Sequence, residues 1–190
     1  MSKTISNKSG LSYKNEIQYT NKNLFQITRD RVTAGNNGCT VFIPHVCNNI
    51  DAFGAGFAAQ VADKYPIVKA DYHMLGKTFL KSNMGHSQFI KVFEDPKYRH
   101  KLFFVNMIAQ NGLINKSNPR PLNYVGLVKA MLSVSNYIQN QTGFTNNSEH
   151  VEIHCPKFGS GLAGGNWNFI QDLIEDIWTK YNVFVYEFRR

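Results

Sequence analysis

The chain has 190 residues, 43% of them hydrophobic, so it can bury a substantial core, and its length favours a single domain. No apolar run approaches the roughly 20 residues that span a bilayer, and the N-terminus lacks the apolar centre of a signal peptide. We therefore expect a cytoplasmic protein without a membrane partner. The net charge of +8 suits an anionic partner. Because the basic residues are scattered, nucleic acid stays open as a partner but gains no support from the pattern.

The three cysteines, Cys39, Cys47 and Cys155, have no metal-ligand spacing, and their odd number fits free thiols in a reducing compartment. Cys47 and Cys155 lie beside two polar loops, and we interpret both as small buried residues rather than nucleophiles. The one HxxxH pattern, at His150 and His154, does not come with a Cys/His metal cluster, so metal catalysis has little support. We therefore expect neither a metal ion nor a cofactor.

The first 23 residues are rich in Ser, Lys, Asn and Thr, and we predict a polar, partly ordered extension there, followed by one domain over residues 24–190. Within the extension only residues 17–19 hint at a strand. Residues 24–28 alternate apolar and polar side chains, which predicts a strand. The Asn-Asn-Gly sequence at residues 36–38 predicts a turn before the next strand.

The stretch from residue 41 to residue 72 organises the rest of the chain. Residues 41–46 form an apolar run that predicts a strand buried on both faces, and Pro44 is tolerable because it lies near the end of that strand. Polar side chains gather where the strand would end, which is the edge at which open α/β sheets bind ligands. These side chains are His45, Asn48, Asn49 and Asp51.

Two glycines, Gly54 and Gly56, come next in the chain. Without a Cβ they let the backbone turn sharply and let a ligand approach the main-chain N–H groups. From Gly56 apolar residues recur at helical spacing until Tyr65, where Pro66 ends the predicted helix. The helix N-terminus therefore points back at the turn, and its N–H groups and dipole suit an anion such as phosphate.

A second loop of the same kind follows a strand predicted at residues 151–155. Residues 157–167 contain four glycines, which permit a tight backbone around a phosphate, and an amphipathic helix follows. Either loop alone fits a purely structural strand-to-helix connection, and neither is a P-loop or a dinucleotide fingerprint. Two such loops in one small chain are stronger evidence than either alone.

The remaining elements follow from periodicity and turn signals. They are a partly helical segment at 67–84, two neighbouring antiparallel strands at 88–93 and 102–108, a helix at 122–139 and a final strand at 183–188. The chain has no internal repeat and no domain linker.

Four motifs occur in order along the chain: HVCNNIDAFGAGFAAQVADKYPIVKADY, NMIAQNG, PKFGSGLAGGNW and VFVYEF. Together they resemble the macro domain family, specifically its branch of ADP-ribose-1″-phosphate processing proteins from fungi, bacteria and phages. The resemblance runs from about residue 24 to residue 188. It implies a three-layer α/β/α fold around a central mixed β-sheet. We expect a monomer, which would act in the host cytoplasm if a phage encodes it.

The resemblance also implies that ADP-ribose lies in a cleft at the strand ends. The first loop would hold the distal ribose and the diphosphate, and the second loop would close over the phosphates. Phe188 would lie near the adenine. The other implied ligand-binding residues are Asn49, Asp51, Ala52, Phe53, Gly54, Ala55, Gly56, Phe57, Gln110, Phe158, Gly159, Ser160, Gly161, Leu162 and Ala163.

The sequence departs from the family pattern at three points. Many members carry a Gly-Asp pair after the first strand whose carboxylate holds the adenine amino group, whereas residues 28–31 read Thr-Arg-Asp-Arg, with Asp30 as the candidate. The lysine and aspartate with which one branch cleaves ADP-ribose from glutamate match Gln110 and Ala163, which disfavours that mechanism. The polyglycine run of the branch that acts on aspartyl and glutamyl esters is missing.

His45, by contrast, matches a histidine that the phosphatase branch needs, although a lone histidine is more often structural. The resemblance therefore implies a metal-independent phosphatase that converts ADP-ribose-1″-phosphate to ADP-ribose and phosphate. His45 would assist proton transfer, Asn48 would orient the distal ribose, and backbone N–H groups would stabilise the phosphoryl charge. Two alternatives stay open, because one fold hosts both: removal of ADP-ribose from a modified macromolecule, and a non-catalytic ADP-ribose-binding module.

Overall fold

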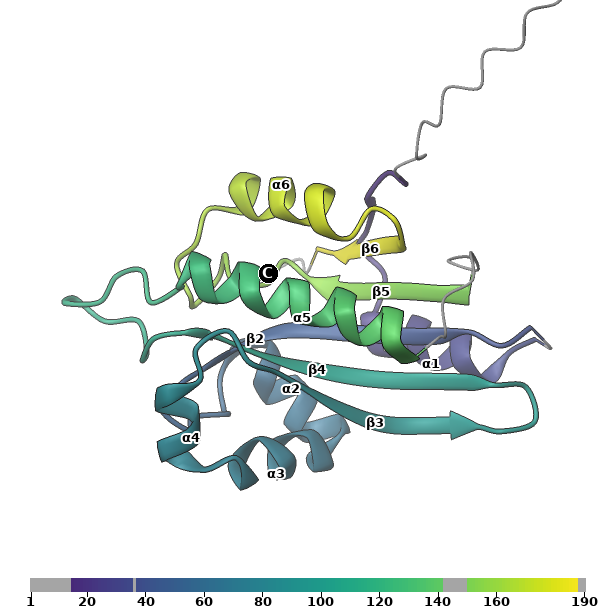
Figure 1. The fold of residues 1–190 in the computed structure, drawn as a ribbon, viewed down its shortest axis with the longest axis horizontal. Coiled ribbons are helices and arrows are strands. Elements are labelled where there is room, and N and C mark those ends of the chain that lie inside the picture. Colours follow the sequence, from purple (N-terminus) through teal and green to yellow (C-terminus); the bar gives the residue numbers. More distant parts are fainter. Residues whose placement is uncertain (1–14, 36, 142–149, 188–190) are drawn as a thin grey trace, which may run out of the picture.

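The computed structural model describes residues 15–35, 37–141 and 150–187, whose fold is drawn in Figure 1. In chain order the elements are β1 (Gln18–Thr20), α1 (Leu24–Thr33), β2 (Thr40–Asn48), α2 (Gly56–Lys64), α3 (Pro66–Met74), α4 (Gly76–Ser82), β3 (Ser87–Asp95), β4 (His100–Gln110), α5 (Tyr124–Gln141), β5 (Val151–Pro156), α6 (Trp167–Ile177) and β6 (Asn182–Tyr186).

Six strands form one mixed sheet in the order β1-β6-β5-β2-β4-β3. All neighbouring strands are parallel except β3 and β4, which pair antiparallel as predicted. Helices α5 and α6 pack on one face of the sheet, and α1 to α4 pack on the other (Figure 1). The predicted three-layer α/β/α fold around a mixed sheet is confirmed.

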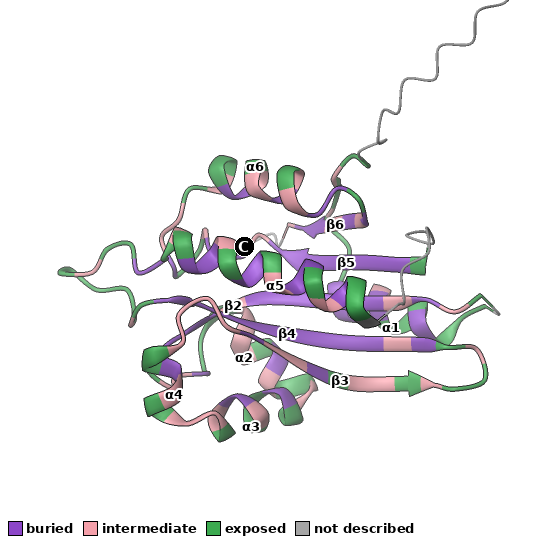
Figure 2. Ribbon diagram, viewed as in Figure 1, coloured by how far each residue is buried: buried purple, intermediate pink, exposed green. Residues whose placement is uncertain are grey.

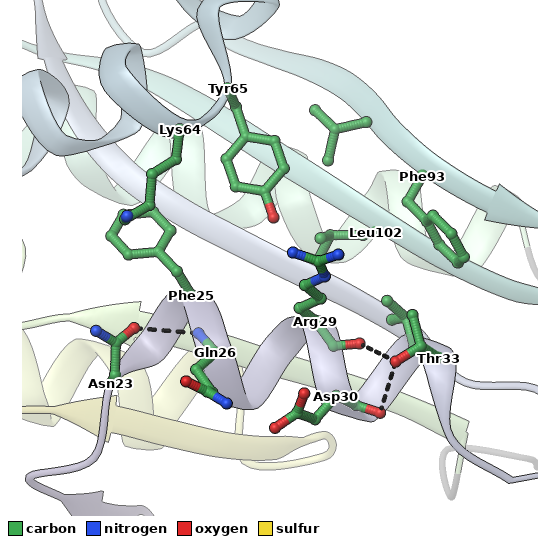
Figure 3. A pocket seen from close by; sticks show the side chains of 12 residues that line it. Asn23, Phe25, Gln26, Arg29, Asp30, Thr33, Lys64, Tyr65, Phe93 and Leu102 are labelled. Carbon is green, nitrogen blue, oxygen red and sulfur yellow. Dashed lines mark hydrogen bonds between the residues drawn. The ribbon is translucent and has the colours of Figure 1, made fainter.

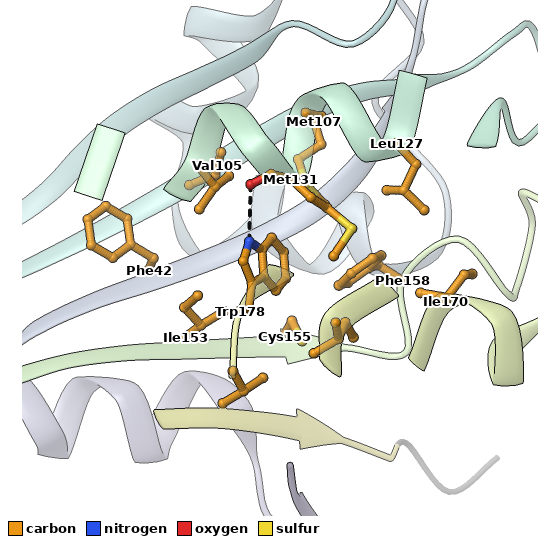
Figure 4. Packing of buried hydrophobic residues seen from close by; sticks show 14 of the residues in the cluster. Phe42, Val105, Met107, Leu127, Met131, Ile153, Cys155, Phe158, Ile170 and Trp178 are labelled. Atoms are coloured by element: carbon orange, nitrogen blue, oxygen red, sulfur yellow. Dashed lines mark hydrogen bonds between the residues drawn. The ribbon is translucent and has the colours of Figure 1, made fainter. Parts of the chain in front are cut away.

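Strand β2 contributes to both halves of the core, because side chains alternate between the two faces of a strand. Phe42 packs in the cluster beneath α5 and α6, whereas Val41 and Ile43 pack in the cluster beneath α1 to α4. Figure 2 shows β2, β4 and β5 almost wholly buried, as expected for strands covered on both faces. Figure 4 shows Trp178 in the first cluster, where its indole N–H donates a 3.1 Å hydrogen bond to the Met131 carbonyl.

The prediction of a strand at residues 24–28 is wrong, because these residues form the start of α1. Asn23 caps that helix, and its Oδ1 accepts a 3.1 Å hydrogen bond from the N–H of Gln26. Buried residues then recur at helical spacing along one face; they are Leu24, Phe25, Thr28 and Val32. The short apolar pattern fits the two-residue period of a strand and the 3.6-residue period of a helix, and the capping asparagine was the signal that favoured a helix.

One smaller expectation also changes. Pro44 lies in the middle of β2 rather than near its end. β2 pairs with β5 only at residues 40–42, so Pro44 lies beyond the part of β2 that pairs with β5. A proline, which cannot donate a backbone hydrogen bond to a neighbouring strand, is tolerated there. Within the polar N-terminal extension, the described residues 18–20 form β1, which pairs with β6 at the edge of the sheet. No helix in the described ranges is both long and apolar enough to cross a membrane.

Candidate functional site

The two glycine-rich loops lie at the same edge of the sheet, because they follow the parallel neighbours β2 and β5. The chain leaves β2 toward β4 and leaves β5 toward β6, so the boundary between them is a topological switch point. Strands β2 and β5 pair only at residues 40–42 of β2, although β2 is nine residues long. The loops also touch, since a Cβ on Gly56 would lie 3.3 Å from Cδ1 of Leu162. We call residues 48–57 and 157–165 the loop junction.

Asn48 fixes the shape of the first loop. Its Oδ1 accepts hydrogen bonds from the backbone N–H groups of Ile50 (3.0 Å) and Ala52 (3.2 Å) and from the Tyr72 hydroxyl (3.1 Å). Its Nδ2 donates to the Ala52 carbonyl at 2.5 Å, and the residue is 7% exposed. The amide has a second N–H, which is the part of Asn48 that a ligand could use.

Asn49 and Gln110 tie the first loop to the loop after β4. Asn49 donates from Nδ2 to Oδ1 of Asn111 (3.0 Å) and accepts at Oδ1 from the N–H of Gly112 (2.9 Å). Gln110 donates from Nε2 to the Gly112 carbonyl at 2.8 Å. Both residues are 8% exposed. The polar side chains predicted at these strand ends therefore lie close together. The hydrogen bonds of Asn49 and Gln110 join the two loops.

Asp51 pairs with a histidine that the sequence analysis did not single out. Its φ of +66° is a left-handed conformation that is uncommon outside glycine. Its Oδ1 lies 2.6 Å from Nδ1 of His73 in α3, and the side chains of Asp51 and His73 are 19% and 37% exposed. No sequence signal indicated this pair, because the residues are 22 positions apart and meet only when α3 folds back against the loop.

The N-terminus of α2 faces the loop junction without a side-chain cap. Its N-cap residue is Ala55, which makes no side-chain capping hydrogen bond. Gly56, the first helical residue, has φ +58°, and a Cβ on Gly54 would meet no atom within 4 Å. An uncapped helix N-terminus beside open space is suited to an anion such as phosphate.

The glycines of the second loop divide into two kinds. A Cβ on Gly159, Gly164 or Gly165 would lie 3.1, 2.6 or 2.3 Å from its nearest neighbour, so close packing requires these glycines. Gly161 differs, because its Cβ would meet nothing within 4 Å and its φ is not in the left-handed region. Gly54 and Gly161 are thus the positions, one on each loop, where a side chain would extend into open space.

The other predicted residues of the second loop differ in exposure. Phe158 and Ala163 are 4% and 5% exposed and pack in the core beneath the loop. The hydroxyl of Ser160 donates to the Lys157 carbonyl at 2.9 Å. Leu162 is 51% exposed. Contact with a ligand at this loop would therefore come from the backbone and from the exposed residues.

His45 lies beneath the first loop and is 2% exposed. Its ring contacts Phe53 and Phe57 edge-on, with centroids 5.7 and 5.5 Å away. Nδ1 lies 3.7 Å from the sulfur of Cys47, and Nε2 has no hydrogen-bond partner among the described residues. Burial lowers the pKa of His45 to about 4, and an interaction with Asn106 opposes that shift only in part. The imidazole is therefore neutral near pH 7.

Asp30 does not join the loop junction. It is exposed on α1, downstream of the capping residue, and lines a separate groove beside that helix. Asn23, which follows β1, is the polar residue that the structure places at the start of α1. Phe188 lies outside the described residues.

The cysteines beside the two loops are buried, as predicted. Cys47 and Cys155 are buried, and burial raises the pKa of both thiols, so they stay protonated. Across the described ranges, no group of three or more His, Cys, Asp and Glu side chains could hold a metal ion.

No family model matches this chain. A curated relative, an uncharacterized 17.5 kDa protein in the tk-vs intergenic region of Enterobacteria phage T4, is 24% identical over 145 residues. That match covers 75% of this chain and 83% of the relative.

Solved structures resemble the chain over most of its length. A protein of unknown function from Bacteroides thetaiotaomicron has a TM-score of 0.71 and 25% identity, covering 92% of this chain and 99% of that one. A macrodomain protein from Streptomyces coelicolor has a TM-score of 0.60 and 26% identity, covering 90% and 98%. This chain has the macrodomain fold.

The same macrodomain fold occurs in DarTG of Thermosipho africanus, which was solved in complex with ADP-ribose. That structure has a TM-score of 0.57 and 16% identity, covering 77% of this chain and 37% of the other. At this identity the likeness shows the fold alone. Within the macrodomain fold of this chain, the loop junction is where topology predicts a ligand site.

Proposed function

We propose that the chain binds ADP-ribose at the loop junction and hydrolyses the terminal phosphate of ADP-ribose-1″-phosphate without a metal ion. The macrodomain fold supports this proposal, as does the neighbour solved with ADP-ribose. The strongest support comes from one observation: two glycine-rich loops touch at a topological switch point, beside a helix N-terminus that has no side-chain cap.

In this proposal the diphosphate lies between the N-terminus of α2 and the backbone of the second loop. Gly54 and Gly161 leave the space for it, because neither position has an atom within 4 Å of an added Cβ. The adenine lies toward the ends of β1 and β6. Asn23 takes the role that the sequence analysis gave to Asp30, because Asn23 follows β1 directly whereas Asp30 lies further along α1.

Hydrolysis requires a proton to be moved as water attacks the terminal phosphate and the bond to the ribose oxygen breaks. His45 is the proposed acid or base, since its Nε2 has no partner among the described residues and can accept a proton. Phe53 and Phe57 cover the ring, so one of them must shift for water to reach it. Asn48 holds the first loop in shape and offers its second amide N–H to the ribose.

Two alternatives concern the same site. Removal of ADP-ribose from a modified macromolecule would use the same pocket with a different leaving group. A binding module would use the loops without proton transfer, and the burial of His45 is the observation that favours it. Turnover measurements, not the fold, separate the three.

Replacing Gly161 by valine should weaken ADP-ribose binding at least about tenfold, because the side chain would occupy space that the diphosphate needs. The fold should tolerate the change, since no atom lies within 4 Å of the added Cβ and the backbone is not left-handed. Isothermal titration calorimetry with ADP-ribose measures the effect.

Ala70→Val is a matched control, because Ala70 is exposed on α3, belongs to neither loop and receives the same valine side chain. That control should bind ADP-ribose like the unaltered protein. Equal affinity of a folded Gly161→Val protein and the control would contradict the placement of the diphosphate beside the second loop.

A further inference from the structure

A second groove runs along α1, on the face of the sheet that carries α1 to α4 (Figure 3). It encloses about 720 Å³ and is lined by α1, the end of α2, β3 and β4. That volume falls within the ~300–1,000 Å³ typical of small-molecule sites. No residue of the loop junction lines it. The rings of Phe25 and Phe57 stack 5.5 Å apart, and Phe57 belongs to the loop junction while Phe25 lines the groove.

Positive charge is the first chemical feature of this groove. Arg29 and Lys64 are exposed, and neither forms an ion pair within the described part of the chain. Lys64 lies over the ring of Phe25, with its Nζ 5.7 Å from the ring centroid. Asp30 is the carboxylate in the lining, and Figure 3 shows it directed away from the Arg29 guanidinium.

The hydroxyl of Tyr65 points toward the same space as the Arg29 guanidinium (Figure 3). Tyr65 is partly buried, burial raises the pKa of its hydroxyl, and the charge of Arg29 acts in the opposite direction. The phenol therefore stays protonated and can donate a hydrogen bond. A guanidinium and a phenol directed at one space, with an ammonium in the same groove over the Phe25 ring, are a donor set suited to a phosphate.

Aromatic and aliphatic side chains form the other wall of the groove. Phe93 on β3 is partly exposed, and Leu102 on β4 lies between it and the cationic end in Figure 3. A partly exposed aromatic ring in the same groove as a cation is a surface on which a nucleobase can stack.

We propose that this groove is a second binding site, for a nucleotide unit. Its phosphate binds Arg29, Lys64 and the Tyr65 hydroxyl, and its base lies against Phe93. A free nucleotide and a single strand of nucleic acid share this chemistry. The groove shares Asn23 with the adenine position proposed above, whereas the residues assigned here to the phosphate and the base lie outside the loop junction.

Fluorescence anisotropy with a labelled single-stranded oligonucleotide of deoxythymidylate tests the proposal at low salt. The double variant Arg29→Ala/Lys64→Ala should bind the probe at least about tenfold more weakly. Its log–log salt slope should also be smaller by about 0.7, because both cations are assigned to one phosphate and each neutralised phosphate on a single strand contributes about 0.7. Phe93→Ala should weaken binding without changing that slope.

Lys77→Ala/Lys116→Ala is the matched control, because it removes the same charge from exposed positions outside the groove. It should bind nearly as the unaltered protein does, and so should Gly161→Val, which alters the loop junction. Competition by AMP shows that a free nucleotide suffices, whereas binding of the oligonucleotide without competition by AMP identifies a strand. Absence of binding by both probes, or equal weakening in the control, overturns the proposal.

Discussion

Replacing His45 by alanine should lower the turnover of ADP-ribose-1″-phosphate by roughly 10²- to 10⁴-fold, the usual contribution of a general acid or base. The affinity for ADP-ribose should change much less, because the ring lies beneath the first loop rather than in the space between the loops. Phosphate release by the folded variant, with calorimetry on the same preparation, measures both quantities.

Stability has to be measured with this variant, because removing a ring that is 2% exposed leaves a cavity. Large-to-small substitutions in a core cost about 2–5 kcal/mol, so the assays belong well below the melting temperature. Asn48→Ala is the companion variant: it removes the hydrogen bonds that shape the first loop and should lower affinity and turnover together. A folded His45→Ala protein with full phosphatase activity would remove His45 from the mechanism.

The protein should lose about 2 kcal/mol of stability between pH 7.5 and pH 5.0 through His45 alone. The native state holds this pKa at about 4, whereas the ordinary value is 6.5. Between those values the unfolded chain binds a proton that the native state excludes, so stability is present above about pH 6.5 and is lost as the pH falls. Burial also lowers the pKa of His154, which adds a loss of the same sign.

Urea unfolding at the two pH values measures this loss. His45→Leu should reduce it by about 2 kcal/mol, because leucine fills much of the same apolar space and does not titrate. Lys116→Leu serves as a control for a substitution at an exposed position, and it should keep the full pH dependence. The same loss in His45→Leu and in the unaltered protein would show that His45 is not held neutral by burial.

Much of the fold could be predicted because its elements have strong local signals. Strand β2, helix α2 and helix α6 each follow from one apolar period and one turn or breaker signal. Helix α1 was missed because residues 24–28 fit a strand pattern and a helix pattern equally well. Only the capping asparagine at position 23 distinguished the two, and that error moved the expected adenine contact to Asp30.

The candidate site was predicted less completely, because its geometry depends on contacts between distant segments. The pairing of Asp51 with His73 exists only when α3 returns to the first loop. The sequence could not separate glycines required by packing from those beside open space. Gly159 and Gly165 are constrained by Leu122 and Ile170, which lie on other segments.

Turnover by the unaltered protein tests the central claim most directly. ADP-ribose-1″-phosphate and an ADP-ribosylated protein are incubated separately with the enzyme and a metal chelator, and released phosphate and released ADP-ribose are quantified. The proposed function predicts release of phosphate from the first substrate and little release of ADP-ribose from the second. Tight binding of ADP-ribose without phosphate release, whether or not ADP-ribose leaves the modified protein, would contradict it.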